Sequence, residues 1–484
     1  MSDVLKDLEP VNVFHFFEEI CGIPHGSGNV KAISDYCVAF ARQRGLEVIQ
    51  DEALNVIIKK PASAGMEHVP AVIIQGHLDM VCEKNSDVAF DFEKDGLRLA
   101  IDGDFIHAQG TTLGGDDGIA VAMGLAILDD DSLIHPALEV LFTTEEETGM
   151  DGAQALNCDN LSAKYMINLD SEEEGVITVG CAGGLKSCAA FPVDDMPFSG
   201  VEYELSISGL LGGHSGAEIH LGRANANKLM GRLLFALRKE MVFGLIEVNG
   251  GAKDNAIARE ATAAVVIPED QCALAQQLIT AAADDIRNEY RVNDSGICIQ
   301  FTKKGDYDDG VLTFATAEKI IYMLFNTPYG VQTMSADLPG LVESSLNLGI
   351  VTTGMDEITL TWAVRSSVKS LKWLINDRLA YMTELLGGEY TWHGDYPEWA
   401  FKPESELRDL AVKTYESMFG KTPVVSTIHA GLECGLFAEK MSGEDMISIG
   451  PDMKDIHTPA ERLSISSTKR TYDYVCRMLA DFRG

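Results

Sequence analysis

The chain has 484 residues, of which 46% are hydrophobic and 23% are charged, and its net charge is −36. Because a single hydrophobic core stops growing at roughly 250–300 residues, this length predicts two or more domains. The negative charge excludes nucleic acid as a partner, and no apolar run approaches the roughly 18 residues that a membrane span needs.

The amino-terminal segment and the cysteines bear on the compartment. The segment MSDVLKDLEPVNVFHFFEE is acidic where a signal peptide is basic and then uniformly apolar. The ten cysteines include no CxxC pair, which fits reduced thiols better than a disulfide framework or zinc bound to cysteine. We therefore expect a cytoplasmic protein.

Residues 1–186 alternate amphipathic helices with β-branched strands, which is an α/β pattern. The apolar strands predict a sheet that is buried on both faces. The predicted elements are helices at 11–21 and 28–44, strands at 46–50, 55–60 and 71–75, a helix beginning near Asp117, and strands at 137–143 and 165–169.

Residues 187–394 have a different pattern, in which polar and apolar residues alternate along the strands. This alternation predicts an antiparallel sheet with helices on one face, an inserted α+β domain. Its units run β-α-β-β-α-β and then α-β-β-α-β, which suggests internal doubling. The elements that define it are strands at 201–209, 341–353 and 357–367 and helices at 223–240 and 368–386.

Residues 395–484 return to the buried α/β pattern, with a helix at 406–420, a strand at 445–450 and a carboxy-terminal helix. We therefore predict one α/β domain, built from 1–186 and 395–484, that is interrupted by the inserted domain at 187–394.

Polar side chains follow several of the predicted strands, where ligands gather in an open α/β sheet. They are His77 and Asp79 in GHLDM, Asp116 in TTLGGDDG, Glu146 and Glu147 in TTEEETG, Asp170 in NLDSEEEG, and His457 in DIHTPAE. Two imidazoles with three carboxylates suit a pair of zinc ions, one carboxylate bridging them. Such a site activates water, and Glu146, beside the ligand Glu147, is placed to accept the proton.

Two other kinds of chemistry, phosphate binding and thiol or serine hydrolysis, have partial motifs in the sequence. The loop TTLGGDDG lacks the GK[ST] ending of a phosphate loop and presents two carboxylates to the supposed anion, so phosphate binding is disfavoured. A thiol or serine hydrolase would use His429 and Cys434 of HAGLECG, or Ser215 of GGHSGA. However, Ala217 stands where GxSxG needs its last glycine, and a buried, inert cysteine is the commoner case.

Seven segments together carry a family resemblance: HLDMV, TTLGGDDG, EEETGMDGA, NLDSEEEG, GGHSGAEIH, HAGLECG and GPDMKDIHTPAE. They resemble the aminoacyl-histidine dipeptidases, which belong to the aminoacylase and carnosinase superfamily of dinuclear zinc metallopeptidases. The resemblance covers nearly the whole chain, in family order. It implies a zinc-peptidase-like domain with a mixed, largely parallel sheet, and hydrolysis of dipeptides, Xaa-His and others, by a metal-activated water.

The resemblance also implies which residue does what. One zinc would take His77 and Asp170, the other Glu147 and His457, with Asp116 bridging, Glu146 as general base and Asp79 orienting His77. The cofactors would be two Zn²⁺ per chain, for which Co²⁺ or Mn²⁺ can substitute. Where the family commonly has Asp-Asn, this chain has Asp116-Asp117. The extra carboxylate leaves the bridging assignment intact and bears on metal preference.

The inserted domain, by the same resemblance, is a lid that closes over a small peptide. His214 would polarise the scissile carbonyl with help from Asn255, and Arg365 would hold the terminal carboxylate through two parallel hydrogen bonds. His429 and Gly431 of HAGLECG would line the pocket for the carboxy-terminal residue. Superfamily members often pair through their lids, so a homodimer is one expectation, although a doubled lid can imitate the partner within one chain.

Two alternatives share the fold. An N-acyl amino acid amidohydrolase of the same superfamily would differ in the groups that meet a free amino terminus, which the sequence does not single out. A metal- or peptide-binding protein without turnover would be expected to lack the base, and Glu146 is present. The side-chain preference of the substrate stays open.

Overall fold

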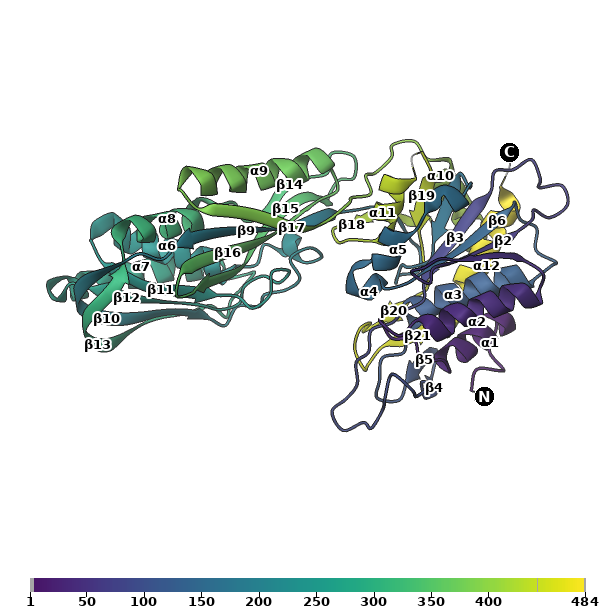
Figure 1. Cartoon of the computed structure of the whole chain (residues 1–484), viewed down its shortest axis with the longest axis horizontal. Helices are drawn as coiled ribbons and strands as arrows, with labels where there is room; N and C mark the ends of the chain where they lie inside the picture. The colour runs from purple at the N-terminus through teal and green to yellow at the C-terminus, as the bar shows by residue number, and fades with distance from the viewer. Residues whose placement is uncertain (1–3, 442, 483–484) are drawn as a thin grey trace. The chain divides into compact units, whose positions relative to one another are not determined.

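The computed structural model describes residues 4–441 and 443–482, which fold into two compact units (Figure 1). Unit 1 comprises residues up to Gly180, Phe401–Thr427 and the chain from Leu432 onward. Unit 2 comprises Cys181–Ala400 and Ile428–Gly431. Unit 2 includes a few more residues at each end than the predicted insert at 187–394, because β9 (Gly183–Pro192) and β17 (Glu389–Tyr396) extend beyond the predicted boundaries. No helix of the described residues is long and apolar enough to span a membrane.

An eight-stranded mixed sheet forms the centre of unit 1. Its order is β1 (Glu47–Gln50), β2 (Val56–Lys60), β6 (Leu138–Thr143), β3 (Val72–His77), β7 (Tyr165–Asn168), β19 (Asp445–Ser448), β8 (Val176–Cys181) and β18 (Val424–Ile428). The strands β6, β3, β7 and β19 run parallel, and β1 and β2 pair antiparallel beside them. Every residue of β3 and β6 is buried, as their unbroken apolar runs predict.

The described residues of unit 1 also form eight α-helices. They are α1 (Val11–Cys21), α2 (Lys31–Gln43), α3 (Gly115–Asp129), α4 (Glu146–Gly149), α5 (Asp151–Ala155), α10 (Glu406–Phe419), α11 (Glu433–Lys440) and α12 (Ile465–Asp481), with a short 3-10 turn at Cys158–Asn160. Of these, α1, α2, α3, α10 and α12 were predicted and lie within a few residues of the expected bounds, whereas α4, α5 and α11 were not predicted. Helix α3 is apolar on all sides because it packs between α1 and β3.

A small four-stranded antiparallel sheet also belongs to unit 1 and was not predicted. Its order is β20 (Met453–Lys454), β21 (Arg462–Ser464), β5 (Phe105–Ala108) and β4 (Leu99–Asp102). The loop between β20 and β21 carries His457. This sheet therefore fastens a late segment of the chain to an early one.

Unit 2 contains one antiparallel sheet of nine strands. Its order is β13 (Cys298–Leu312), β10 (Asp195–Ser208), β12 (Ala261–Ile267), β11 (Gly244–Gly250), β15 (Val342–Thr353), β16 (Glu357–Ser366), β9 (Gly183–Pro192) and β17 (Glu389–Tyr396), and β14 (Gly330–Met334) pairs with β15. Its main helices are α6 (Ala226–Glu240), α7 (Cys272–Glu289), α8 (Phe314–Asn326) and α9 (Lys369–Leu385), with short turns at Ile219–Leu221 and Glu269–Gln271.

The strand order shows that unit 2 is built from two similar halves. The first half, β10-α6-β11-β12-α7-β13, has the spatial order β13-β10-β12-β11. The second half, formed by β9, α8, β15, β16, α9 and β17, has the corresponding order β17-β9-β16-β15. The halves join where Gly250 of β11 pairs with Val351 of β15. The doubling predicted from the element order is therefore present in the topology.

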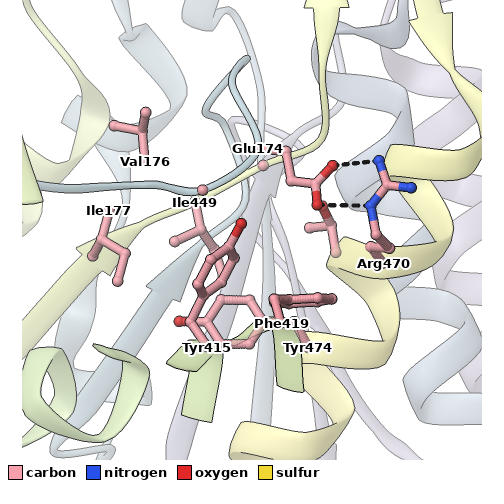
Figure 2. A pocket seen from close by; sticks show the side chains of 11 residues that line it. Glu174, Val176, Ile177, Tyr415, Phe419, Ile449, Arg470 and Tyr474 are labelled. Carbon is pink, nitrogen blue, oxygen red and sulfur yellow. Dashed lines mark hydrogen bonds and ion pairs between the residues drawn. The ribbon is translucent and has the colours of Figure 1, made fainter. Parts of the chain in front are cut away.

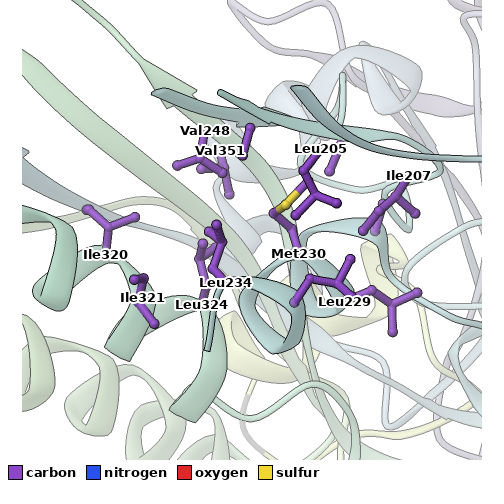
Figure 3. Close-up of a cluster of buried hydrophobic side chains, with 14 of the residues drawn as sticks. Leu205, Ile207, Leu229, Met230, Leu234, Val248, Ile320, Ile321, Leu324 and Val351 are labelled. Carbon is purple, nitrogen blue, oxygen red and sulfur yellow. The ribbon is translucent and has the colours of Figure 1, made fainter. Parts of the chain in front are cut away.

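The two halves share one hydrophobic core (Figure 3). In the figure, Leu205 and Leu234 from the first half and Ile320 and Leu324 from the second point into the same cluster. All four side chains are buried. Because neither half covers its own apolar surface completely, we expect the two to fold together.

Candidate active site

The predicted metal ligands of unit 1 lie at the carboxyl edge of its parallel strands. His77 is the last residue of β3, Asp170 follows β7, and Glu147 lies in α4 just after β6. Asp116 lies in the first turn of α3, where its ψ of 104° is not helical. His457 enters from the loop between β20 and β21, with a φ of 60°.

The distances divide these donors into two groups that share Asp116. His77 Nε2 lies 3.1 Å from Asp116 Oδ1 and 3.7 Å from Asp170 Oδ1. His457 Nε2 lies 3.2 Å from Asp116 Oδ2 and 3.0 Å from Glu147 Oε1. The two oxygens of one carboxylate thus face two different imidazoles, which is the arrangement that a bridging ligand requires.

The donor set fits a pair of divalent metal ions. Within each group the ligand atoms lie within 4.8 Å of one another, and donors around one tetrahedral zinc lie roughly 3.4 Å apart. A third group of the same kind joins His77, Glu146 and Glu147. Burial raises the pKa of Asp170 well above its usual range, and the charges of Asp117 and Asp116 add to this. Such crowded, buried carboxylates favour a cation among them.

Neighbouring carboxylates raise the pKa of both imidazoles. Burial lowers the pKa of His77, but its hydrogen bonds with Asp116 and Asp79 outweigh burial and bring that pKa well above its usual value. Hydrogen bonds with Asp116 and Glu147 raise the pKa of His457 to about 10. Because a metal ligand must be a neutral imidazole, binding of cations here is expected to release protons.

Asp79 connects the ligand His77 to the loop that carries Glu146. It is almost fully buried, and its carboxylate lies 3.5 Å from His77 Nδ1, whose other contact is the Asp79 carbonyl at 3.0 Å. The same carboxylate accepts hydrogen bonds from the backbone N–H groups of Glu146 and Glu147 and from the hydroxyl of Ser27. A carboxylate in this position orients the imidazole of a metal ligand.

Glu146 is a largely buried carboxyl group beside the metal-ligand candidate Glu147, and its pKa is raised. Burial raises its pKa to about 8; the charges of Glu433, Glu147 and Asp116 raise it further and that of His77 lowers it. A base poised near the working pH can accept a proton and later return it.

Asp117, the residue after Asp116, supports the backbone of His77. It is fully buried, and its Oδ2 accepts a hydrogen bond from the backbone N–H of His77 at 3.2 Å. Burial raises its pKa well above the usual value, opposed by the charge of His77. Among the described residues Asp117 belongs to no candidate metal group, so its direct role is to hold the end of β3.

Glu433 was not singled out in the sequence, although it lies in HAGLECG. Its fully buried carboxylate accepts hydrogen bonds from Gln75 Nε2 at 2.6 Å and from Thr143 Oγ1 at 2.7 Å. Burial raises its pKa to about 7. Because Gln75 and Thr143 lie on β3 and β6, Glu433 ties α11 to the two strands that end at His77 and at the Glu146 loop.

Unit 2 brings together a second set of predicted residues around Arg365 of β16. The Arg365 side chain is 9% exposed, its Nη1 donates to the hydroxyl of Tyr396 at 2.7 Å, and its Nη2 lies 3.5 Å from His214 Nε2. In the described part of the chain no carboxylate lies within ion-pair distance of Arg365, and its Nε has no hydrogen-bond partner. This buried cation lacks a counter-ion, and a carboxylate of a ligand would supply one.

The pKa values of His214 and His429 are both lowered in this cluster. Burial and then the charge of Arg365 lower the pKa of His214. Burial, Arg365 and His214 together lower the pKa of His429 to about 3. The Nε2 of His429 is 2.7 Å from Ser345 Oγ. A neutral imidazole can donate a hydrogen bond to a carbonyl oxygen without adding a second cation.

The other predicted residues of unit 2, Asn255 and Gly431, make no side-chain hydrogen bond to Arg365 or His214 among the described residues. Asn255 has an exposed side chain, and its backbone carbonyl accepts a hydrogen bond from the N–H of Ser215, next to His214. Gly431 lies against the ring of Tyr396, where a side chain would meet the ring at 2.9 Å. The hydroxyl of Ser215 is buried and has no hydrogen-bond partner among the described residues, so no base is placed to activate it as a nucleophile.

Tyr396 is a member of this cluster that sequence reasoning missed. It ends β17, and its neighbours are fixed by the buried Lys372, which pairs with Asp395 at 2.7 Å and Glu398 at 3.1 Å. Lys372 Nζ also donates to the Tyr396 carbonyl at 2.9 Å. No motif marks a tyrosine of this kind, because its importance comes from the contact of its hydroxyl with Arg365.

None of the predicted site residues lines a small cavity in unit 1 (Figure 2). It holds about 10 Å³, room for one water molecule, between the rings of Tyr415, Phe419 and Tyr474 and the chain at Ile449. At its rim Glu174 and Arg470 form two parallel hydrogen bonds of 2.7 and 2.6 Å. The cavity is too small for a peptide, and the ion pair fixes the segment that follows Asp170.

Comparison with known proteins identifies the family. The model of peptidase family M20/M25/M40 matches residues 73–481. The cytosol non-specific dipeptidase of Escherichia coli (strain K12) is 38% identical over 479 residues, which are 99% of each chain. The crystal structure of aminoacylhistidine dipeptidase from Vibrio alginolyticus superposes with a TM-score of 0.94 at 37% identity, covering 100% of this chain and 99% of that one. Aminopeptidase PepT from Bacillus cereus, at 15% identity and a TM-score of 0.56, shares the fold alone. The chain belongs to peptidase family M20/M25/M40.

Proposed function

We propose that this protein is a metal-dependent dipeptidase that hydrolyses Xaa-His and other dipeptides. The observation that carries the proposal is the position of Asp116. One of its carboxylate oxygens lies 3.1 Å from His77 Nε2 and the other 3.2 Å from His457 Nε2, close to the spacing between two ligands of one zinc ion. The relatives named a cytosol non-specific dipeptidase and an aminoacylhistidine dipeptidase support it along the full length of the chain.

We assign the metal ligands by their distances. His77 and Asp170 would hold one ion and Glu147 and His457 the other, with Asp116 between them. Imidazole nitrogen and carboxylate oxygen are ordinary ligands of zinc, so two Zn²⁺ are the proposed cofactors, with Co²⁺ or Mn²⁺ as substitutes. The remaining group of donors includes Glu146, which we assign to proton transfer instead because Glu147 is already the ligand from α4.

In this proposal the side chains of unit 1 divide the work of hydrolysis. Divalent ions at such a site make water more acidic and stabilise negative charge on a carbonyl oxygen. Glu146 accepts the proton of the attacking water and then delivers it to the departing amine. Asp79 keeps the His77 ring and the Glu146 backbone in place while this happens.

The cluster in unit 2 is proposed to bind the peptide. Arg365 would pair with the terminal carboxylate, because its guanidinium is buried and has no counter-ion in the described part of the chain. Neutral His214 would donate a hydrogen bond to the scissile carbonyl, and His429 and Gly431 would border the carboxy-terminal residue. Asn255 contributes by holding the backbone beside His214.

The protein is proposed to work in the cytoplasm, as the name of its Escherichia coli relative states for that protein. A homodimer through unit 2 remains a prediction, which sedimentation of the purified protein would test. The doubled unit 2 supports the alternative of a complete monomer, since His214 and Arg365 already meet within one chain.

The decisive experiment is a hydrolysis panel with the purified protein. It compares Xaa-His dipeptides, other dipeptides, tripeptides and N-acyl amino acids after loading with zinc, cobalt or manganese. Turnover of dipeptides that a chelator abolishes and added metal restores is the expected result. Preference for N-acyl amino acids would replace the proposal with an amidohydrolase, and loss of activity with a thiol alkylator alone would contradict the metal mechanism.

A further inference from the structure

Four consecutive backbone N–H groups at the start of α3 point at one carboxylate. Glu461 Oε2 accepts hydrogen bonds from Leu113 at 2.7 Å and Gly114 at 3.2 Å, and Oε1 accepts from Gly115 at 2.8 Å and Asp116 at 3.4 Å. Glu461 is 3% exposed. Each of its oxygens therefore accepts two hydrogen bonds, and the residue is largely shielded from solvent.

This arrangement explains why TTLGGDDG is glycine-rich like a phosphate loop although it lacks the GK[ST] motif. Successive N–H groups ahead of a helix form a concave site for anions, which in phosphate loops is filled by the ligand. Here the chain's own carboxylate occupies it. Gly114 has a φ of 65°, which glycine adopts readily, and a side chain at Gly115 would meet Glu461 Oε1 at 3.3 Å.

Glu461 reaches this loop from the segment that carries His457. Its own N–H donates to the Thr458 carbonyl at 3.0 Å, so the turn after His457 is closed by the same residue. Asp116 and His457 thus lie on the two segments that the Glu461 carboxylate fastens together. Their side chains meet with 3.2 Å between His457 Nε2 and Asp116 Oδ2.

We propose that Glu461 is a positioning residue of the metal centre, which fixes the backbone of the bridging ligand Asp116 relative to His457. The inference rests on the proposed metal site and adds a residue that touches neither metal nor substrate. The Glu461 carboxylate would hold the Asp116 backbone in the orientation in which each Asp116 oxygen faces a different imidazole. A small rotation of the loop would spoil both contacts at once.

The test compares Glu461→Gln with Glu139→Gln. Glu139 is a matched control: it is also 3% exposed, lies in unit 1, and accepts hydrogen bonds from the N–H groups of Ser162 and Ala163 and the Ser162 hydroxyl. Each substitution puts an amide NH₂ against N–H donors, so both variants should melt at lower temperature. Glu461 accepts a hydrogen bond from the backbone of Asp116 itself, whereas Glu139 contacts Ser162 and Ala163, which lie before β7 and are not ligand candidates.

The readout is binding of Zn²⁺ and Co²⁺ to the dialysed protein, measured by competition with a chelator and by the absorption spectrum of bound Co²⁺. Glu461→Gln should weaken metal binding by roughly 10- to 100-fold and change the Co²⁺ spectrum, as loss of a residue that orients ligands does. Glu139→Gln should bind metal as the unmodified protein does. Equal metal affinity in the two variants would overturn the inference.

A second variant covers the case in which Glu461→Gln does not fold. Glu461→Asp keeps the charge but is one methylene shorter, so it should fold and still bind metal more weakly than Glu139→Gln does. Failure of the unmodified protein to bind metal would contradict the proposed function itself. Normal metal binding by the unmodified protein and by Glu461→Asp would contradict only the role of Glu461.

Discussion

The carboxylate of Asp79 accepts a hydrogen bond from the backbone N–H of Glu146, with 3.0 Å between Oδ1 and N. The same oxygen lies 3.5 Å from His77 Nδ1. One buried carboxylate therefore sets the position of a metal ligand and of the proposed base. Because the base is held by its backbone, its side chain can be changed without disturbing His77.

Glu146→Gln should separate proton transfer from metal binding. Glutamine keeps the size of the side chain but accepts no proton, and general bases typically contribute about 100- to 10,000-fold to the rate. The variant should retain its metals, measured by elemental analysis, while kcat falls by that range. A metal-loaded Glu146→Gln protein with full turnover would remove Glu146 from the mechanism.

Alanine substitutions of the ligands should show that Asp116 is shared. His77→Ala and His457→Ala each remove a ligand of one ion, so each should lose mainly one metal per chain. Asp116→Ala should lose both, because both groups of donors include it. Metal per chain is measured after gel filtration, with exposed His15 changed to alanine as a control. An Asp116→Ala protein that holds two metals would contradict the bridging assignment.

Arg365→Ala should weaken binding of substrates that carry a terminal carboxylate. A hydrogen bond to a charged group contributes about 1.5–3 kcal/mol, so KM for a dipeptide should rise by roughly 10- to 100-fold. A dipeptide amide should be nearly indifferent to the change. Tyr396→Phe, which removes only the hydroxyl at 2.7 Å from Nη1, should have a smaller effect of the same kind.

His214→Ala is the companion variant, and it should lower kcat more than it raises KM. A hydrogen bond that strengthens as charge develops on the carbonyl oxygen stabilises the transition state above all. Both variants should keep their metals. Equal penalties on acid and amide substrates in Arg365→Ala would show that the arginine has only a structural role.

His429 should make the stability of the protein depend on pH. Its folded-state pKa of about 3 lies below the usual value of 6.5, so the unfolded chain binds more protons between these two values. The stability contribution is complete above pH 6.5 and is lost as the pH falls toward 3. At pH 5 the loss amounts to up to about 2 kcal/mol.

The comparison uses His429→Asn, which cannot titrate. Denaturant unfolding at pH 7 and pH 5 should show a smaller drop in the variant than in the unmodified protein. An identical drop in both would mean that His429 is protonated as easily in the folded state as in the unfolded one.

Much of unit 1 could be predicted because its strands are continuous apolar runs that end in polar residues. That pattern located β3, β6 and β7 and, with them, His77 and Glu147. The four-stranded sheet was missed because β20 and β21 contain only two and three residues, too few for any periodicity. The place of His457 in the site was predicted, whereas the sheet that holds its loop was not.

The supporting residues could not be found in the sequence for a different reason. Glu461 acts on backbone N–H groups that are 348 residues away at Leu113, and the glycines of that loop do not reveal which carboxylate of the chain those groups bind. Tyr396 and Glu433 act through contacts that exist only once the strands are in order. A motif located Asp79, which lies two residues from its partner His77, whereas positioning residues far from their partners in the sequence emerged only from the packed structure.

The joining of the two halves of unit 2 in one chain affects how the activity should depend on protein concentration. His214 follows β10 in the first half and Arg365 lies on β16 in the second, and they come within 3.5 Å of each other inside one polypeptide. When two such residues belong to separate subunits, their meeting obeys mass action and fails as the concentration falls below the dissociation constant. Because His214 and Arg365 belong to one chain, their meeting does not depend on the protein concentration. If the protein is a monomer and metal is kept in excess, the activity per molecule should therefore stay constant from micromolar to picomolar protein.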